Sequence, residues 1–293
     1  MNSERIKNRI GIAAYELGKS PVVHFADQLA MANELAEGVQ SPNDFEILHH
    51  HLYNHSHPHM RRLGSLALLN LPYSLYQQAA KWAEKDLQDE FKWVQYDAVR
   101  FFYVNATLDE QIVQRIGEMQ TQDSDLLKAI QQVQNASREI KNSYQATLTA
   151  RSHFNLQFSI PENWVVKESN ETTVVYSSPD FESLQLSKNK CLSTLKVQFI
   201  PGLTPEEIKE MIELNMELME DTNEVLAGYE TGKKDRRILF TRKPAANFPD
   251  FIIREFIDCG SALAVVSVLS PLAHIEFALS RNTSTLNSFT FCP

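Results

Sequence analysis

Histidine is concentrated in one short segment of this chain: six of its nine histidines lie between residues 49 and 59. On a continuous helix His51, His55 and His59 would share one face, because residues four apart are neighbours on a helix. Imidazole nitrogen is a common protein ligand for zinc and nickel. These three histidines are therefore the candidate metal ligands of the chain.

Two features of the same segment argue against a metal site. The stretch Asn54–Pro58 has the composition of a turn, which would break the continuous helical face. No His-Glu-x-x-His motif and no distant set of cysteines and histidines completes a ligand group. We expect a solvated loop between two helices, with no metal and no cofactor. A metal-dependent enzyme built on His49–His59 remains the alternative.

Motifs for covalent or nucleotide chemistry are absent from the sequence. It contains no Gly-x-Ser-x-Gly, no P-loop and no Gly-x-Gly-x-x-Gly. The three cysteines, Cys191, Cys259 and Cys292, form no Cys-x-x-Cys pair. That pattern indicates a reducing compartment rather than a disulfide framework. We therefore expect a non-enzymatic protein with no catalytic residue.

The charge balance narrows the class of partner. The 293 residues include 37 acidic and 28 basic side chains, for a net charge of −9. Nucleic-acid phosphates are repelled by such a surface, whereas a basic protein is attracted to it. The longest apolar run, Ala262–Leu269, is far shorter than the ~20 residues that span a bilayer. We expect a cytoplasmic protein that binds another protein and neither crosses a membrane nor binds nucleic acid.

The clearest helix signal, Thr204–Asp221, carries a strongly acidic face. Its start has a capping box, since Thr204 is followed three residues later by Glu207. Opposite an apolar side that contains several methionines, glutamates form a stripe. The docking residues predicted for a basic partner are Glu210, Glu213 and Glu217, with Met216 at the edge of the stripe. The alternative is the solvated face of a helix that packs on a sheet.

A second candidate surface is rich in aromatic residues. In the segment 93–103 the small and aliphatic residues follow the expected core stripe, whereas Trp93, Tyr96 and Tyr103 are expected to project from it. Half-exposed aromatic side chains are typical anchors for a bound protein segment. Core packing is the alternative for at least half of them.

The elements that must position these residues differ between the two halves of the chain. The first half is rich in Ala, Leu, Gln and Glu with helical spacing, and the second in β-branched residues. We place the boundary in Ser143–Ser152, with domains at 1–145 and 153–293. The first half is predicted to form helices at Ser3–Leu17, Pro21–Glu37, Pro42–Tyr53, Pro58–Leu69, Tyr73–Leu87, Phe91–Asn105, Leu108–Glu118 and Asp123–Lys141.

The helical half contains a degenerate internal repeat. The segment from Met60 to Leu68 aligns with the segment from Val94 to Phe102, at an offset of 34 positions. Repeated helix pairs of this length stack into a right-handed solenoid. The pattern resembles the HEAT-repeat family over about residues 20–140. An ordinary helical bundle is the alternative.

The second half is predicted to be a sheet with two packed helices. Strands are expected at Phe154–Ile160, Trp164–Lys167, Thr172–Ser177, Leu192–Ile200, Val225–Thr231, Arg237–Arg242, Phe251–Asp258, Leu263–Leu269 and Leu286–Phe291. A second helix is expected at Leu272–Ser280, in addition to the acidic helix Thr204–Asp221. Short turns between consecutive strands favour antiparallel pairing, so the whole chain is predicted to be an α+β protein of two domains.

This order of elements, with Phe158-Ser159-Ile160-Pro161-Glu162-Asn163-Trp164 near its start and Ser288-Phe289 near its end, resembles the PsbP-like superfamily. Within it the chain is most similar to the bacterial DcrB-like group. That resemblance implies an accessory protein. It points either to an immunity protein that neutralises a toxin associated with type VI secretion, or to an adaptor-chaperone for a secretion effector. The oligomeric state stays open.

Overall fold

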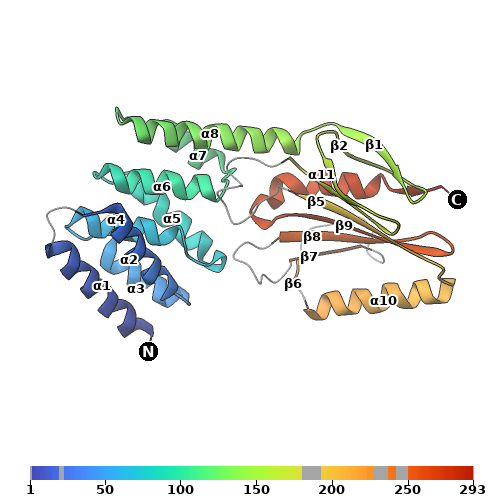
Figure 1. Cartoon of the computed structure of the whole chain (residues 1–293), viewed down its shortest axis with the longest axis horizontal. Coiled ribbons are helices and arrows are strands. Elements are labelled where there is room, and N and C mark those ends of the chain that lie inside the picture. The colour runs from blue at the N-terminus through green and yellow to red at the C-terminus, as the bar shows by residue number, and fades with distance from the viewer. Residues whose placement is uncertain are drawn as a thin grey trace. The chain divides into compact units, whose positions relative to one another are not determined.

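The computed structural model describes residues 2–19, 23–179, 193–222, 224–226, 237–241 and 250–292 (Figure 1). The chain divides into two compact units, Met1–Ser137 and Arg138–Pro293. The first unit is helical and the second is built on antiparallel sheets with packed helices. The predicted two-part α+β fold class is therefore confirmed.

All eight predicted helices of the first half are present within a few residues of their expected ends. The second begins at Phe25, and residues 20–22 of its predicted start lie outside the described part of the chain. The helices are α1 (Asn2–Lys19), α2 (Phe25–Glu37), α3 (Pro42–Leu52), α4 (Pro58–Leu68), α5 (Tyr76–Asp86), α6 (Lys92–Val104), α7 (Glu110–Gly117) and α8 (Ser124–Tyr144), with a short 3-10 turn at Tyr73–Leu75.

Alternate helices are neighbours in this unit. Helix α4 packs against α2 on one side and α6 on the other, and α1 packs against α3. Helices α4 and α6 begin at Pro58 and Lys92, which keeps the offset of the sequence repeat. This stacking is what repeated helix pairs require. Membership of the HEAT-repeat family remains a prediction.

A buried ion pair joins the layer formed by α2, α4 and α6. Arg62 Nε of α4 donates to Asp97 of α6 over 2.8 Å, and Arg62 Nη1 donates to Gln28 of α2 over 3.2 Å. Both charged side chains are almost fully buried. Burial raises the pKa of Asp97 to about 6, although Arg62 lowers it. Three helices thus share one buried polar connection.

The second unit contains a seven-stranded antiparallel sheet and a smaller three-stranded one. The large sheet has the order β3-β4-β5-β9-β8-β7-β6, and the small one β1-β2-β10. The strands are β1 (Leu148–His153), β2 (Leu156–Pro161), β3 (Val165–Ser169), β4 (Thr173–Ser177), β5 (Thr194–Pro201), β6 (Glu224–Val225), β7 (Arg237–Thr241), β8 (Asp250–Asp258), β9 (Ala262–Pro271) and β10 (Thr290–Phe291).

Two helices cover opposite faces of the large sheet, α10 (Pro205–Thr222) and α11 (Ile275–Asn287) (Figure 1). Successive side chains of a strand point to opposite faces, and β8 shows this directly. Its Phe256 packs with Ile208 and Ile212 of α10. Its Glu255 pairs with Arg237 of β7, and that arginine also donates to α11.

Three predictions about this half are wrong. Residues 148–152, assigned to the boundary between the domains, form β1 together with His153. The predicted strand start at Phe154 is instead a tight turn, because Phe154 and Asn155 have φ of 53° and 57° and join β1 to β2 as a two-residue hairpin loop. The predicted last strand Leu286–Phe291 shrinks to β10, because α11 continues to Asn287. The part of the strand Val225–Thr231 from residue 227 onward lies outside the described residues.

The helical unit buries a second carboxyl group, that of Asp86 at the end of α5. Ser65 of α4 donates a hydrogen bond to it. Burial nonetheless raises the pKa of Asp86 to about 7, and the negative charges of Asp89 and Asp97 add to the effect. The folded state therefore binds a proton at Asp86 over a pH range in which the unfolded chain does not.

We predict that Asp86→Asn raises the free energy of unfolding at pH 8 by about 2 kcal/mol, because the variant no longer buries a charge. Between pH 8 and pH 5 the wild type gains stability as Asp86 takes up its proton, so the difference should shrink towards pH 5. Urea denaturation at both pH values measures it. A variant that is less stable than the wild type at pH 8 would contradict the account.

Candidate functional site

The outer face of α10 combines exposed leucines with glutamates. Leu214 is 65% exposed and Leu218 is 54% exposed, and the two lie one helical turn apart. Glu210 and Glu217 lie one turn before and after Leu214 on the same side of the helix, and both are exposed. This face of α10 therefore presents apolar surface within a rim of negative charge.

The helix positions these side chains through its start and its buried side. The predicted capping box is present: Thr204 N–H donates to Glu207 Oε2 over 2.8 Å, and Glu207 N–H donates to Thr204 Oγ1 over 3.3 Å. The Thr204 N–H and the Thr204 hydroxyl both donate to the Glu207 carboxylate, which holds the pKa of Glu207 below its ordinary value. Ile208 and Ile212 are buried against the sheet. The outward direction of Leu214 and of the glutamates follows from that packing.

The predicted docking residues of α10 fall into two groups. Glu210, Glu213 and Glu217 are all exposed, and Glu213 lies 3.8 Å from Lys209. Met216 is only partly exposed and packs against the sheet in both apolar clusters beneath α10. The acidic residues thus lie where a partner could reach them, whereas Met216 contributes mainly to the packing of the helix.

The predicted aromatic residues of α6 also fall into two groups, one half-buried and one buried. Trp93 is half-buried, its ring lies 5.0 Å from the Arg62 guanidinium, and it meets Tyr96 edge to face at 5.9 Å. Tyr103 does not project: it is 7% exposed and belongs to the core of the helical unit. The expectation for Tyr103 is corrected, because α6 packs against both α4 and α5. The partner roles of Trp93 and Tyr96 stay predictions.

The histidine segment is divided between two helices, as the turn composition predicted. Helix α3 ends at Leu52 and α4 begins at Pro58, so His51, His55 and His59 share no face. His55 Nδ1 accepts a hydrogen bond from the His57 N–H over 3.0 Å. His59 Nδ1 lies 2.8 Å from the side chain of Gln28. Within the described ranges no group of three or more His, Cys, Asp or Glu residues could hold a metal ion.

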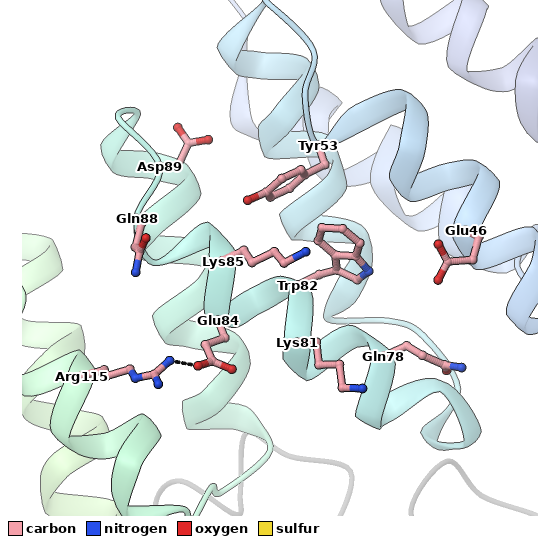
Figure 2. Close-up of a pocket in the computed structure, with 10 residues that line it drawn as sticks. All are labelled: Glu46, Tyr53, Gln78, Lys81, Trp82, Glu84, Lys85, Gln88, Asp89 and Arg115. Atoms are coloured by element: carbon pink, nitrogen blue, oxygen red, sulfur yellow. Dashed lines mark ion pairs between the residues drawn. The ribbon is translucent and has the colours of Figure 1, made fainter.

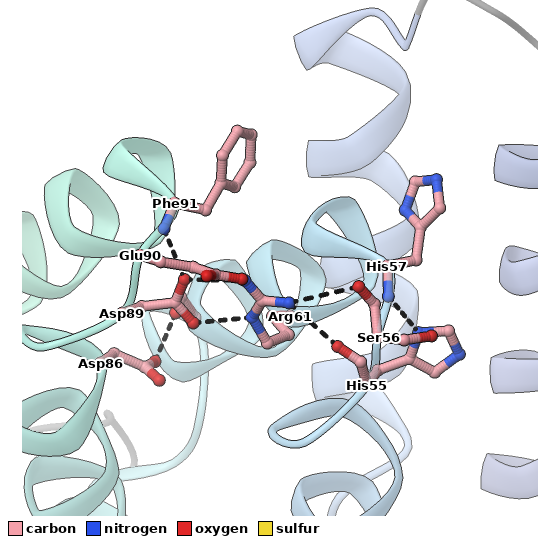
Figure 3. Close-up of polar contacts among 9 residues, drawn as sticks. His55, Ser56, His57, Arg61, Asp86, Asp89, Glu90 and Phe91 are labelled. Carbon is pink, nitrogen blue, oxygen red and sulfur yellow. Dashed lines mark hydrogen bonds and ion pairs between the residues drawn. The ribbon is translucent and has the colours of Figure 1, made fainter.

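An arginine holds the turn between these helices in place (Figure 3). Arg61 makes two hydrogen bonds to the Asp89 carboxylate, of 2.7 and 3.0 Å, and an ion pair with Glu90. The same guanidinium donates to the carbonyl of His55 over 3.1 Å. Its pKa is raised, first of all by the hydrogen bonds to Asp89. The histidine turn is therefore tied to the loop that follows α5.

A groove of about 690 Å³ lies beside this turn, between α3, α5 and α7 (Figure 2). Figure 2 shows Tyr53, Trp82 and Lys85 close together, with Glu84 and Arg115 joined by an ion pair at another part of the lining. The residues that line it are Glu46, Tyr53, Gln78, Lys81, Trp82, Glu84, Lys85, Gln88, Asp89 and Arg115.

Trp82 is held on both faces of its ring. The His49 imidazole stacks on it with ring centroids 3.1 Å apart, and the Lys85 ammonium lies 3.6 Å from the ring centroid. Both groups are too close to share one face, so they cover opposite faces. Burial, followed by the charge of Lys85, lowers the pKa of His49 to about 3. His49 is therefore neutral at physiological pH, and the contact of Lys85 is a cation–π interaction.

Sequence reasoning identified the acidic stripe but not Leu214 as a surface residue, and it missed the groove in the helical unit. A usable signal existed for the leucines, because the apolar positions of α10 cover more of the helix than one sheet can bury. For the groove the signal was weak. Lys81 and Lys85 are spaced four apart on α5, but the approach of Lys85 to Tyr53 depends on how α3 and α5 pack.

Comparisons with known proteins give structural matches only. No protein-family model and no curated protein matches the sequence. The Ran-binding protein Mog1p of Saccharomyces cerevisiae matches with 12% identity over 50% of this chain and 95% of Mog1p, with a TM-score of 0.34. The cyanobacterial PsbP of Synechocystis matches with 12% identity over 50% of this chain and 94% of that protein, with a TM-score of 0.31.

A protein from Bacteroides thetaiotaomicron matches with 10% identity over 51% of this chain and 49% of its own, with a TM-score of 0.35. Nothing about the partner or activity of this chain follows from these matches, and the DcrB-like assignment remains a prediction. No helix in the described residues is long and apolar enough to cross a membrane.

We predict that Arg61→Lys lowers the free energy of unfolding by about 1–2 kcal/mol, because a lysine cannot make the paired hydrogen bonds to Asp89. Hydrogen exchange at the amides of His55 and His57 should become faster, since the arginine also fixes the turn. Arg5→Lys, on the exposed surface of α1, is the matched control. Unchanged exchange in Arg61→Lys would show that the turn does not depend on this arginine.

Proposed function

We propose that this chain is a non-enzymatic protein-binding protein that docks a basic partner on the outer face of α10. The observation that carries the proposal is the pair Leu214 and Leu218, exposed side by side within the rim of Glu210, Glu213 and Glu217. Burial of apolar surface favours association, whereas charged rims speed association and select partners. A basic surface with an apolar centre complements this face.

The more specific form of the proposal is a bacterial immunity protein that binds and neutralises a toxin associated with type VI secretion. The net charge of −9 supports a basic cognate partner. The alternative role, an adaptor for a secretion effector, would use an apolar groove lined by Met211, Met216, Leu218 and Met219. The three methionines pack on the sheet, which favours the immunity role, whereas the exposed Leu218 is available to either role.

A metal-dependent enzyme is the third candidate, and the geometry favours it least. His51, His55 and His59 lie on different elements, and two of them are hydrogen-bonded to other groups. We propose a cytoplasmic location, as the sequence predicts. Of the described cysteines, Cys259 and Cys292 are both free thiols, which fits a reducing compartment.

Affinity purification from the native host, followed by measurement of binding to the purified partner, tests the proposal. We expect a basic protein to bind the wild type, and the double variant Leu214→Asp, Leu218→Asp to bind it at least tenfold more weakly, or ~1.4 kcal/mol less favourably. Ile12→Asp is the matched control, because Ile12 is 62% exposed on α1. Equal affinity of the wild type and the double variant would refute the proposed surface.

The immunity role has its own test. If the partner arrests the growth of bacterial cells, we expect co-expression of the wild-type chain to restore growth and the double variant of α10 to fail. Thermal unfolding of both purified forms checks that the double variant is folded. A partner that leaves growth unaffected would contradict the immunity role and leave protein binding as the function.

A further inference from the structure

We propose that the turn between α3 and α4 is an acid-sensitive switch, in which protonation of His55 and His59 opens the turn and loosens its contact with α2. This segment holds six of the nine histidines, and the proposed docking face of α10 makes no use of it. Within the described residues neither His55 nor His59 belongs to a group that could hold a metal ion. The switch goes beyond the proposed function and is independent of it.

The buried side chain of Gln28 determines the protonation state that His59 must have. Gln28 of α2 is fully buried, and its Oε1 accepts a hydrogen bond from Arg62 Nη1 over 3.2 Å. A guanidinium can only donate, so the NH2 group of this amide is the end that lies 2.8 Å from His59 Nδ1. His59 Nδ1 therefore has to accept, which requires a neutral ring with its proton on Nε2.

Protonation of His59 removes this hydrogen bond. Both ring nitrogens of an imidazolium are donors, so the Nδ1–H would face the NH2 group of Gln28 with no acceptor between them. Rotation of the amide offers no relief, because it would turn the NH2 group towards Arg62. A buried donor without an acceptor is costly, so a charged His59 leaves its place against α2.

His55 is under the same restriction within the turn (Figure 3). Its Nδ1 accepts a hydrogen bond from the His57 N–H over 3.0 Å. A backbone N–H cannot accept, so this contact also needs an unprotonated Nδ1. Two hydrogen bonds at this turn thus depend on neutral histidines, and histidine is the side chain that ordinarily changes charge between about pH 5 and pH 8.

The positive charges beside His59 oppose its protonation. Partial burial lowers the pKa of His59, and the charges of His57 and Arg62 lower it further. The His57 and His59 rings lie 5.6 Å apart, so charging both of them adds a repulsion. Because the folded state holds this ring neutral, the contribution of His59 to stability is lost as the pH falls below its ordinary pKa of 6.5.

The acidic side chains of the neighbouring elements do not pair with His59. Asp27, in the first turn of α2, is exposed to solvent. Asp89 and Glu90, which precede α6, both pair with Arg61. Among the described residues His59 makes no ion pair with a carboxylate, so a charge on this ring finds no fixed counter-charge.

Two buried carboxyl groups of the same unit respond to acid in the opposite direction. Burial raises the pKa of Asp86 to about 7 and that of Asp97 to about 6. The folded helical unit therefore binds protons more tightly there than the unfolded chain does, and it gains stability as the pH falls through those values. Acidification thus opens the turn while the helices around it stay folded.

The switch also reaches one of the aromatic residues predicted to bind a partner. The Arg62 guanidinium lies 5.0 Å from the centre of the Trp93 ring and 5.0 Å from that of Phe25. Gln28 links this guanidinium to His59. A change at His59 therefore alters the surroundings of Trp93, so acid regulates the aromatic surface at the start of α6.

Hydrogen exchange at pH 7.5 and pH 5.5, corrected for the intrinsic rate at each pH, tests the switch. The first amide to follow is that of His57, which donates to His55. The others are those of Met60 and Arg61, which donate to the His57 carbonyl. In the wild type we expect their protection to fall about tenfold at pH 5.5, while that of α10 is unchanged. EDTA is present throughout, so that metal ions play no part.

The double variant His55→Asn, His59→Asn separates protonation of the two rings from other effects of acid. The asparagine side-chain oxygen replaces Nδ1 as an acceptor and cannot become charged. We expect this variant to keep its protection at pH 5.5. His51→Asn, at an exposed histidine of the same segment, is the matched control and should respond to acid as the wild type does.

Nitrogen-15 spectra of the histidine rings give a readout on the wild type itself, whether or not the double variant folds. At pH 7.5 the rings of His55 and His59 should carry their proton on Nε2. The loss of protection should have the same pH midpoint as the protonation of these rings.

Several results would overturn the proposal. They are a proton on His59 Nδ1 at pH 7.5, equal protection of the wild-type turn at both pH values, or a loss of protection with a midpoint different from that of the two rings. A loss in the double variant as large as in the wild type, or an equal loss in α10, would overturn it as well.

Discussion

A sheet can cover only one side of a helix, and this constraint decides what α10 presents to solvent. Ile208 and Ile212 occupy the side that faces β8 and β9, and Met216 and Met219 extend it towards β7. The sequence supplies more apolar residues than this side can hold. Leu214 and Leu218 are the excess, and they lie outward among glutamates. Exposed leucines lower the solubility of a protein unless a partner covers them. The acidic rim favours a partner with a basic surface.

The helical unit depends on a different constraint, the cost of burying charge. Arg62 and Asp97 are both buried, so each must find its partner across two helices, and Gln28 extends the contact to a third. Such a pair adds little net stability, but removing one partner is expensive. It therefore penalises any shift of α4 relative to α6. Arg61, the next residue along, fixes the turn after α3 by pairing with Asp89, which also lines the groove.

Periodicity predicted the elements well because it reports burial along one chain segment. The eight helices of the first half and the capping box at Thr204 follow from local sequence, and the structure confirms them. The predictions were wrong where the backbone conformation or the packing against other elements determines the structure. The positive φ angles of Phe154 and Asn155 made a hairpin loop out of a pattern that alternates like a strand. Tyr103 was expected to project, but its neighbouring helices bury it.

The candidate sites were predictable to the same extent. Glutamates spaced three and four apart define a face from sequence alone, so Glu210, Glu213 and Glu217 were identified as exposed. Local sequence patterns could not predict the contacts between helices. The stacking of His49 on Trp82 joins α3 to α5, and one sequence carries no signal for it. The histidines differ in this respect. Their spacing would fit one helix, but the turn composition of Asn54–Pro58 predicted the division between two helices that the structure shows.

Site-specific photo-crosslinking in the native host tests the central claim most directly. A photoreactive amino acid is placed at Leu214, at the inward-facing Met216, or at Ile12 on α1. The account predicts that position 214 crosslinks to one basic protein, and that positions 216 and 12 do not. A crosslink at position 12 or 216 with none at position 214 would show that the outer face of α10 is not the binding surface.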